Sequence, residues 1–169
     1  MHYPSLREFI DRLESEGELL RIKKSVSPIL EITEITDRVS KLPGGGKALL
    51  FENVEGSSMP VLINAFGSTK RMNMALGVYN VEDIAKRIER YIKIPPPITL
   101  LDKAKLLPML LQAAQFPPSL LHTAHPPCQE VVHLNDDIDL GMIPILQCWP
   151  QDAGRFITLP IVINRSVDK

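Results

Sequence analysis

The chain has 169 residues, 44% of them hydrophobic and 23% charged, with a net charge of −1. These values are typical of a globular protein with a buried core and exclude a disordered chain or a coiled-coil rod. The weak net charge argues against a general nucleic-acid binder. Two cysteines are too few for a disulfide framework, so we expect Cys128 and Cys148 to be reduced thiols of a cytoplasmic protein.

The N-terminal residues contain no apolar segment of the kind that signal peptides carry. No apolar run approaches the ~18 residues of a membrane span. We therefore expect neither a secretory signal nor an integral membrane segment.

The first half of the chain predicts alternating helices and strands. Ser5 begins a capping box with Glu8 and Gly17 ends that helix, which is followed by a strand over 18–23. Ser27 and Pro28 predict the start of a second helix over 27–39. The further predicted elements are a glycine turn at 43–46, strands at 48–51 and 61–65, and helices at 69–76 and 81–92, the last one capped by Asn80.

The second half of the chain is richer in proline and less regular. Three prolines at 95–97 predict a domain boundary near residue 95. A helix over 100–115 that is interrupted at Pro108, an irregular segment, a short strand at 130–134 and a stronger strand at 156–164 follow. Residues 66–105 carry eight basic and four acidic side chains. This excess suits either an anionic ligand or, more simply, a solvated helix face.

Three clusters of polar residues invite a functional interpretation. Residues 44–47 lack both ends of the phosphate-binding loop, so we interpret them as a glycine turn. Residue types that can bind zinc occur at His122, His125, Cys128 and His133. Their spacing matches no common zinc motif, and the alternative is that they are polar residues of a proline-rich connector without a ligand. The carboxylates of Asp136, Asp137 and Asp139 suit a hard cation or acid–base chemistry, but they lack the Gly and distal Glu of a calcium loop, and we favour a turn with acidic caps.

The residues alone reveal no catalytic set. Ser57 and Ser58 follow a glycine, but the Gly-x-Ser-x-Gly nucleophile motif is absent. We therefore assign no catalytic residue and no metal ligand from the sequence.

Several stretches in a fixed order resemble the UbiD family of decarboxylases, and together they extend over almost the whole chain. They are LREFI at 6–10, EGEL at 16–19, RI at 21–22, LEI at 30–32, DR at 37–38, ALLFENV at 48–54, MPV at 59–61, NAFGS at 64–68, KR at 70–71, MALG at 74–77, DIDL at 137–140, IP at 143–144, CWP at 148–150 and DAGRFIT at 152–158.

The resemblance implies an α+β fold: a mixed α/β N-terminal domain followed by the beginning of a split β-barrel that binds flavin. It divides the chain into an N-terminal domain at 1–95, a proline-rich helical connector at 96–129 and a truncated barrel domain at 130–169. Thr158 matches a position that contacts the flavin in the family, and Arg155 lies close to it in the sequence.

The resemblance also implies a chemistry. Family members use prenylated FMN, with a divalent metal and K⁺, to remove CO2 from aromatic acids or to add it. Many serve ubiquinone or menaquinone biosynthesis, acting on a polyprenyl-hydroxybenzoate or a naphthoate precursor. A flavin prenyltransferase supplies the cofactor, and the full-length proteins are expected to be homo-oligomers. The cofactor supplies the reactive centre, which explains why the chain shows no nucleophile.

Three hypotheses follow. The first is an enzyme portion, inactive and free of cofactor by itself, because the family's catalytic Arg and two Glu lie beyond the stretch that resembles 156–164. The second is a non-catalytic binding or assembly module, or one subunit of a split decarboxylase, which pairs its open strand with a partner. The third is a zinc module at the His and Cys positions named above.

Overall fold

A computed structural model describes residues 3–93, 104, 106–108, 110–111, 126, 129–161 and 166. Within it the chain divides into two compact units, one made of residues 1–83 and 139–169 and the other of residues 84–138. These compact units are not the domains predicted from the sequence, whose division at residues 95 and 130 stays a prediction. The predicted helix over 100–115 falls largely outside the described residues.

The first unit is built on a mixed sheet of three strands, β1 (Leu19–Ile22), β2 (Ala48–Phe51) and β3 (Val61–Ile63), in the order β1-β2-β3. Strand β1 pairs parallel to β2, with Leu19 opposite Ala48. Strand β3 pairs antiparallel to β2, with Phe51 opposite Val61. The structure therefore has the α+β character that the sequence predicts.

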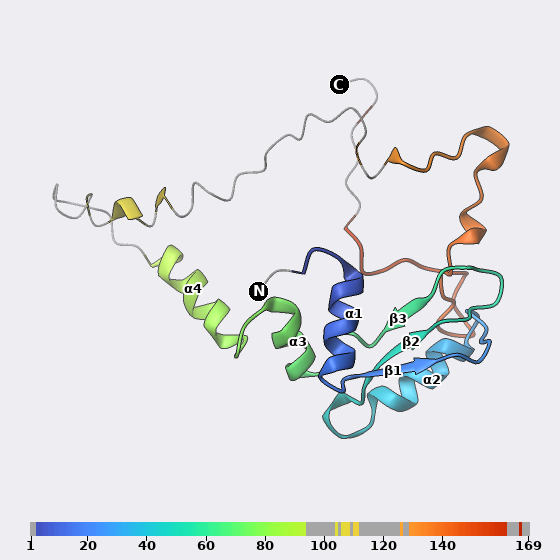
Figure 1. The fold of residues 1–169 in the computed structure, drawn as a ribbon, viewed down its shortest axis with the longest axis horizontal. Coiled ribbons are helices and arrows are strands. Elements are labelled where there is room, and N and C mark those ends of the chain that lie inside the picture. Colours follow the sequence, from blue (N-terminus) through green and yellow to red (C-terminus); the bar gives the residue numbers. More distant parts are fainter. Residues whose placement is uncertain are drawn as a thin grey trace. The chain divides into compact units, whose positions relative to one another are not determined.

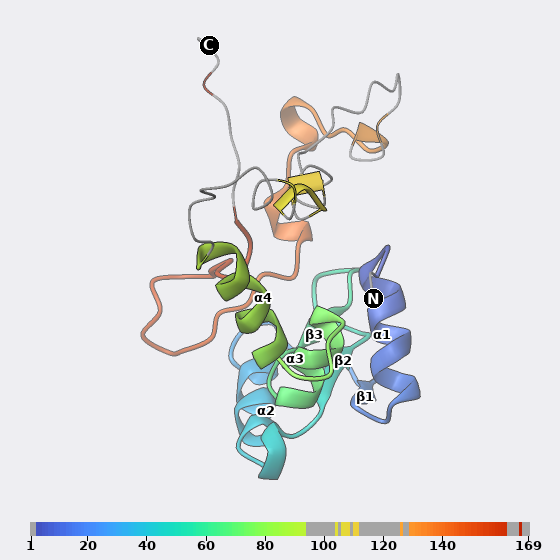
Figure 2. The ribbon, with the colours of Figure 1, turned by 90° about the vertical axis from the view of Figure 1, so that its left-hand side faces the viewer.

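Helices α1 (Leu6–Ser15) and α2 (Glu31–Ser40) cover opposite faces of this sheet (Figures 1 and 2). All four residues of β2 are buried, because β2 is the central strand and both of its faces are covered. Alternate side chains of β2 therefore join two separate cores. The α1 core contains Phe9, Leu13, Leu19, Ala48 and Leu50, and the α2 core contains Val26, Ile32, Leu49, Phe51 and Val54.

Helix α3 (Thr69–Leu76) adds Met74 and Ala75 to the α1 core. Ser68 caps its first turn by accepting a hydrogen bond from the Arg71 amide, and Gly77 ends it in the left-handed conformation. Helix α4 (Glu82–Ile92) begins where predicted, because the Asn80 side chain accepts from the Glu82 amide at 3.0 Å.

The predicted start of the second helix is wrong. Helix α2 begins at Glu31 and not at Ser27, because Leu30 adopts φ 66° and ψ −38° and the Glu31 amide donates to the Ile29 carbonyl. This strained γ-turn interrupts the helix that Ser27 and Pro28 suggest. Backbone hydrogen bonds between residues 28–30 and Gln147 hold the turn: Gln147 N donates to Pro28 O, and Leu30 N donates to Gln147 O.

Both strands predicted in the second half are also wrong as far as the structure describes them. Residues 130–134 form no strand, and neither do residues 156–161, whereas 162–164 lie outside the described residues. A strand exists only where a neighbour pairs with it. For residues 156–161 the structure gives a single backbone hydrogen bond, from Phe156 N to Leu146 O at 3.2 Å.

The glycine turn is as predicted, and steric contact explains its composition. A short 3₁₀ turn, Pro43–Gly45, leads into β2, and Gly45 and Gly46 both have positive φ. A Cβ added at Gly45 would lie 1.9 Å from the Gly67 carbonyl oxygen, so two turns meet here without room for a methyl group.

We expect Gly45→Ala to lower the free energy of unfolding by about 3 kcal/mol or more, since strain at φ 83° adds to the backbone clash. Gly17→Ala is the matched control, because Gly17 has φ 69° but nothing within 4 Å of an added Cβ. That control should cost about 1 kcal/mol. Urea unfolding of both variants measures the difference, and equal losses would contradict this account of the turn.

Candidate functional site

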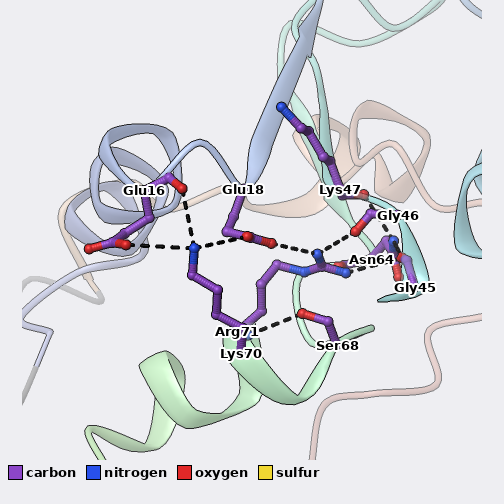
Figure 3. A network of polar contacts seen from close by, with 9 residues as sticks. All are labelled: Glu16, Glu18, Gly45, Gly46, Lys47, Asn64, Ser68, Lys70 and Arg71. Atoms are coloured by element: carbon purple, nitrogen blue, oxygen red, sulfur yellow. Dashed lines mark hydrogen bonds and ion pairs between the residues drawn. The ribbon is translucent and has the colours of Figure 1, made fainter. Parts of the chain in front are cut away.

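The most densely connected polar group in the described residues is the guanidinium of Arg71, on the first turn of α3 (Figure 3). The side chain is 0% exposed. Its Nε donates to the Asn64 carbonyl at 3.2 Å, Nη1 to the Gly46 carbonyl at 2.5 Å, and Nη2 to the Gly45 carbonyl at 3.2 Å. A planar fork of donors is the group that reaches several carbonyls at once.

The charge of Arg71 is balanced by Glu18, which precedes β1. Arg71 Nη1 lies 3.0 Å from Glu18 Oε2, and Lys70 Nζ lies 3.0 Å from Glu18 Oε1. Burial alone would raise the pKa of Glu18, but hydrogen bonds from Lys70 and Arg71 outweigh that effect and lower the pKa. The hydrogen bond with Glu18 likewise raises the pKa of Lys70. The carboxylate is therefore held ionised.

Asn64 completes the arrangement around the glycine turn. Its side-chain amide donates to the carbonyls of Gly45 and Lys47, each at 2.9 Å. The residue itself has φ 56°, a left-handed conformation that asparagine tolerates. Figure 3 shows Arg71 and Asn64 converging on the carbonyls of the 45–47 turn. The network fixes the turn that enters β2, and nothing in it is arranged as a nucleophile with a base.

The structure describes only some of the residues predicted as sites. Thr158 and Arg155 are exposed, and the structure describes no strand that would turn them toward a common pocket. His133 is exposed, whereas His122, His125 and Cys128 lie outside the described residues. Among the described residues no three His, Cys, Asp or Glu side chains are placed to share a metal ion.

The acidic cluster forms turns, as one of its two interpretations predicts. Asp136 and Asp137 lie in a 3₁₀ turn, Asn135–Asp137. Asp139 accepts a hydrogen bond from the Gly141 amide at 2.7 Å and so caps the following turn, Leu140–Met142. Local capping accounts for the Asp139 carboxylate without any ligand.

Sequence reasoning did not single out the Arg71 network. Arg71 follows a serine cap and is separated by many residues from Glu18 and from the glycine turn, so no local spacing marks it. The pair Lys70-Arg71 belongs to the stretches that resemble the family, and together with the glycines at 44–46 and 67 it was the available signal.

Comparison with known proteins identifies the family. Residues 10–90 match the family model described as the 3-octaprenyl-4-hydroxybenzoate carboxy-lyase N-terminal domain, UbiD_N. Residues 120–169 match the model of the Rift-related domain of the same carboxy-lyase, UbiD. The chain therefore belongs to the UbiD family.

Curated relatives extend well beyond this chain. An uncharacterised protein of Aquifex aeolicus is 51% identical over 96% of the chain, which covers 33% of that relative. An uncharacterised protein of Archaeoglobus fulgidus is 47% identical over 98% of the chain, which covers 32% of it. The chain thus spans about a third of the length of the curated relatives it matches.

Solved structures give the same assignment. Vanillic acid decarboxylase of Sedimentibacter hydroxybenzoicus in its open form is similar with a TM-score of 0.66 and 26% identity, over 92% of this chain and 30% of that one. An evolved dimeric form of the UbiD-class enzyme HmfF from Pelotomaculum thermopropionicum, in complex with prFMN, has a TM-score of 0.61 and 29% identity, over 92% of this chain and 31% of that one.

The sequence predicts no membrane-spanning segment, and the helices of the structure bear on this prediction. Among the helices of the described residues, none combines the length and the apolar character that a bilayer crossing requires.

Arg71→Met should lower the free energy of unfolding by about 3–5 kcal/mol, because it leaves Glu18 and three carbonyls without their buried partner. Lys70→Met is the matched control: Lys70 is 52% exposed, so its loss should cost less than about 1 kcal/mol. Chemical denaturation of the two variants tests this, and similar losses would contradict the central role of Arg71.

Acid should destabilise the fold through Glu18. A carboxyl with a lowered folded-state pKa contributes stability that is present above its unfolded pKa and is lost as the pH falls through the folded value. We expect the urea midpoint to fall below about pH 4.5. Glu18→Gln should be less stable at pH 7 and show a shallower acid dependence. A variant with an unchanged acid profile would refute this assignment.

Proposed function

We propose that the chain is the part of a UbiD decarboxylase that contains the N-terminal domain and the beginning of the flavin-binding barrel, with the domains divided at residues 95 and 130. The observation that carries this proposal is the match of two models of one carboxy-lyase, in the family's order, at 10–90 and 120–169. The complex of HmfF with prFMN supports prenylated FMN as the cofactor of the whole protein.

The reaction we propose is the removal of CO2 from an aromatic acid, with a polyprenyl-hydroxybenzoate or a menaquinone-precursor naphthoate as the substrate class. When bound, prenylated FMN supplies the reactive centre, while a divalent metal and K⁺ accompany it. A flavin prenyltransferase supplies the cofactor, and the protein acts as a homo-oligomer in the cytoplasm in ubiquinone or menaquinone biosynthesis. The match of residues 10–90 to the N-terminal domain of a 3-octaprenyl-4-hydroxybenzoate carboxy-lyase supports this substrate class.

The residues described here do not by themselves fit a flavin. Arg155 and Thr158 offer a cationic donor and a hydroxyl, but both side chains are exposed, and no described strand surrounds them. A cofactor of this size needs a largely enclosing site. We therefore expect the 169-residue chain to be inactive and free of cofactor by itself. In the whole protein we propose Thr158 as a flavin contact, because it matches a position that contacts the flavin in the family, with Arg155 as its neighbour.

The test compares the isolated chain with the natural-length protein, each purified from cells that also produce prenylated FMN. We expect flavin absorbance and release of CO2 from an aromatic acid with the natural-length protein and neither with the isolated chain. Turnover by the isolated chain would contradict its proposed inactivity, and a natural-length protein without flavin would contradict the assignment of cofactor.

Thr158→Val in the natural-length protein should weaken flavin binding about fivefold, the value of one ordinary hydrogen bond. Thr158→Ser keeps the hydroxyl and is the matched control. Titration of the apoprotein with FMN, followed by flavin fluorescence, measures both variants. Equal affinities for the two would remove Thr158 from the flavin site.

A further inference from the structure

The segment that contains Thr158 follows a closed loop at residues 146–156. Phe156 N donates a hydrogen bond to Leu146 O at 3.2 Å, so the two ends of the loop lie next to each other. Thr158 lies two residues after this closing hydrogen bond. Whatever fixes the loop therefore also fixes the point from which the backbone continues to Thr158.

The Asp152 side chain holds the loop from within. Its Oδ2 accepts hydrogen bonds from the amides of Cys148 and Trp149 at 3.2 and 2.9 Å. In return, Asp152 N donates to the Trp149 carbonyl at 3.1 Å. Hydrogen bonds from amides to an ionised carboxylate are among the stronger ones in proteins. One half-buried side chain thus sets the course of the backbone over residues 148–152.

The beginning of the loop is anchored on the N-terminal part of the chain. The Leu146 side chain packs against the α2 core. Gln147 N donates to Pro28 O at 3.1 Å, and Leu30 N donates to Gln147 O at 2.9 Å. Apolar packing and backbone hydrogen bonds therefore both join the loop to the segment that precedes α2, although the two are far apart in the sequence.

The strained turn at Leu30 serves this anchor. A helix capped by Ser27 would direct the Leu30 amide to the serine oxygen, whereas the observed turn, with φ 66°, directs it to Gln147 O. Leucine rarely adopts a positive φ, and such strain persists only where the surrounding structure determines the backbone from several sides. Strained residues concentrate at functional sites, so the turn indicates that the position of the 146–156 loop matters beyond the packing of α2.

We propose that Asp152 is a positioning residue for the flavin contact: it holds the 146–156 loop closed on the anchor at Leu30, and the loop then presents Thr158 in one place. In this role Asp152 acts through the backbone of the loop and not by touching the flavin. The inference rests on the proposed function, because it deepens the assignment of Thr158. A protein whose loop is in the binding arrangement for only part of the time shows an affinity reduced by that fraction.

Titration of the natural-length apoprotein with FMN, followed by flavin fluorescence, tests the role of Asp152. Asp152→Ala should raise the Kd about tenfold without changing the number of sites, because the loop then leaves the binding arrangement for most of the time. Asp152→Asn keeps a carbonyl oxygen as acceptor and should recover most of the affinity. An Asp152→Ala protein that binds FMN as tightly as the unaltered protein would overturn the inference.

Ser57→Ala is the matched control. Ser57 Oγ donates to Met142 O at 2.8 Å and so holds the same part of the chain, but ahead of the loop. This variant should lose a comparable amount of stability in urea and keep the Kd for FMN unchanged. An equal rise of the Kd in both variants would overturn the inference, since a general loosening of the segment would then explain the effect of Asp152→Ala.

Hydrogen exchange gives a readout that needs no flavin. Asp152→Ala should speed the exchange of the amides of Cys148, Trp149 and Phe156 about tenfold, and Ser57→Ala should leave these rates unchanged. Rates that do not change in Asp152→Ala would show the positioning role to be wrong, whatever the result with FMN. Rates that change as expected in a protein that binds no FMN even when unaltered would show the proposed function to be wrong, and the assignment of Thr158 and Asp152 to a flavin site would fall with it.

Discussion

The buried guanidinium of Arg71 is the interaction on which the first unit of the fold depends. It joins the start of α3, the residue before β1, the turn before β2 and the loop after β3, four segments that are distant in the sequence. A charge removed from water is tolerated only when its donors are satisfied and its charge is balanced. The carbonyls of the glycine turn and the Glu18 carboxylate meet both conditions, so this centre specifies one arrangement of the segments that flank the three strands.

The glycines near this centre follow from it. Carbonyl oxygens can converge on one guanidinium only if the backbone turns tightly and approaches other backbone closely. The near contact of Gly45 with the Gly67 carbonyl is the consequence, and side chains larger than hydrogen are excluded there. The turn that resembles a phosphate-binding loop in composition therefore has a structural cause, and the carbonyl oxygens of residues 45–47 accept hydrogen bonds from the side chains of Arg71 and Asn64.

The Arg71 network contains no nucleophile with a base, and we propose that the contact with flavin lies elsewhere in the chain. The family assignment covers both the sheet unit and the segment at 120–169, whereas the residues that resemble flavin contacts lie in an exposed segment beyond the Asp152 turn. On the proposed assignment of Thr158, the sheet unit supports the segment that contains Arg155 and Thr158. This division agrees with a chemistry in which the cofactor supplies the reactive centre and the protein supplies position.

The sequence by itself determined the elements whose signals are local: the Ser5 and Asn80 caps, the glycine turn, the strand at 48–51 and the family. Only the tertiary structure decided where α2 begins, that residues 156–161 form no strand, and that Arg71 is the buried centre of a polar network. The reason is physical. The Leu30 turn depends on pairing with Gln147, a strand depends on a neighbour, and a buried charge depends on partners far away in the chain. No local pattern of residues encodes such partners.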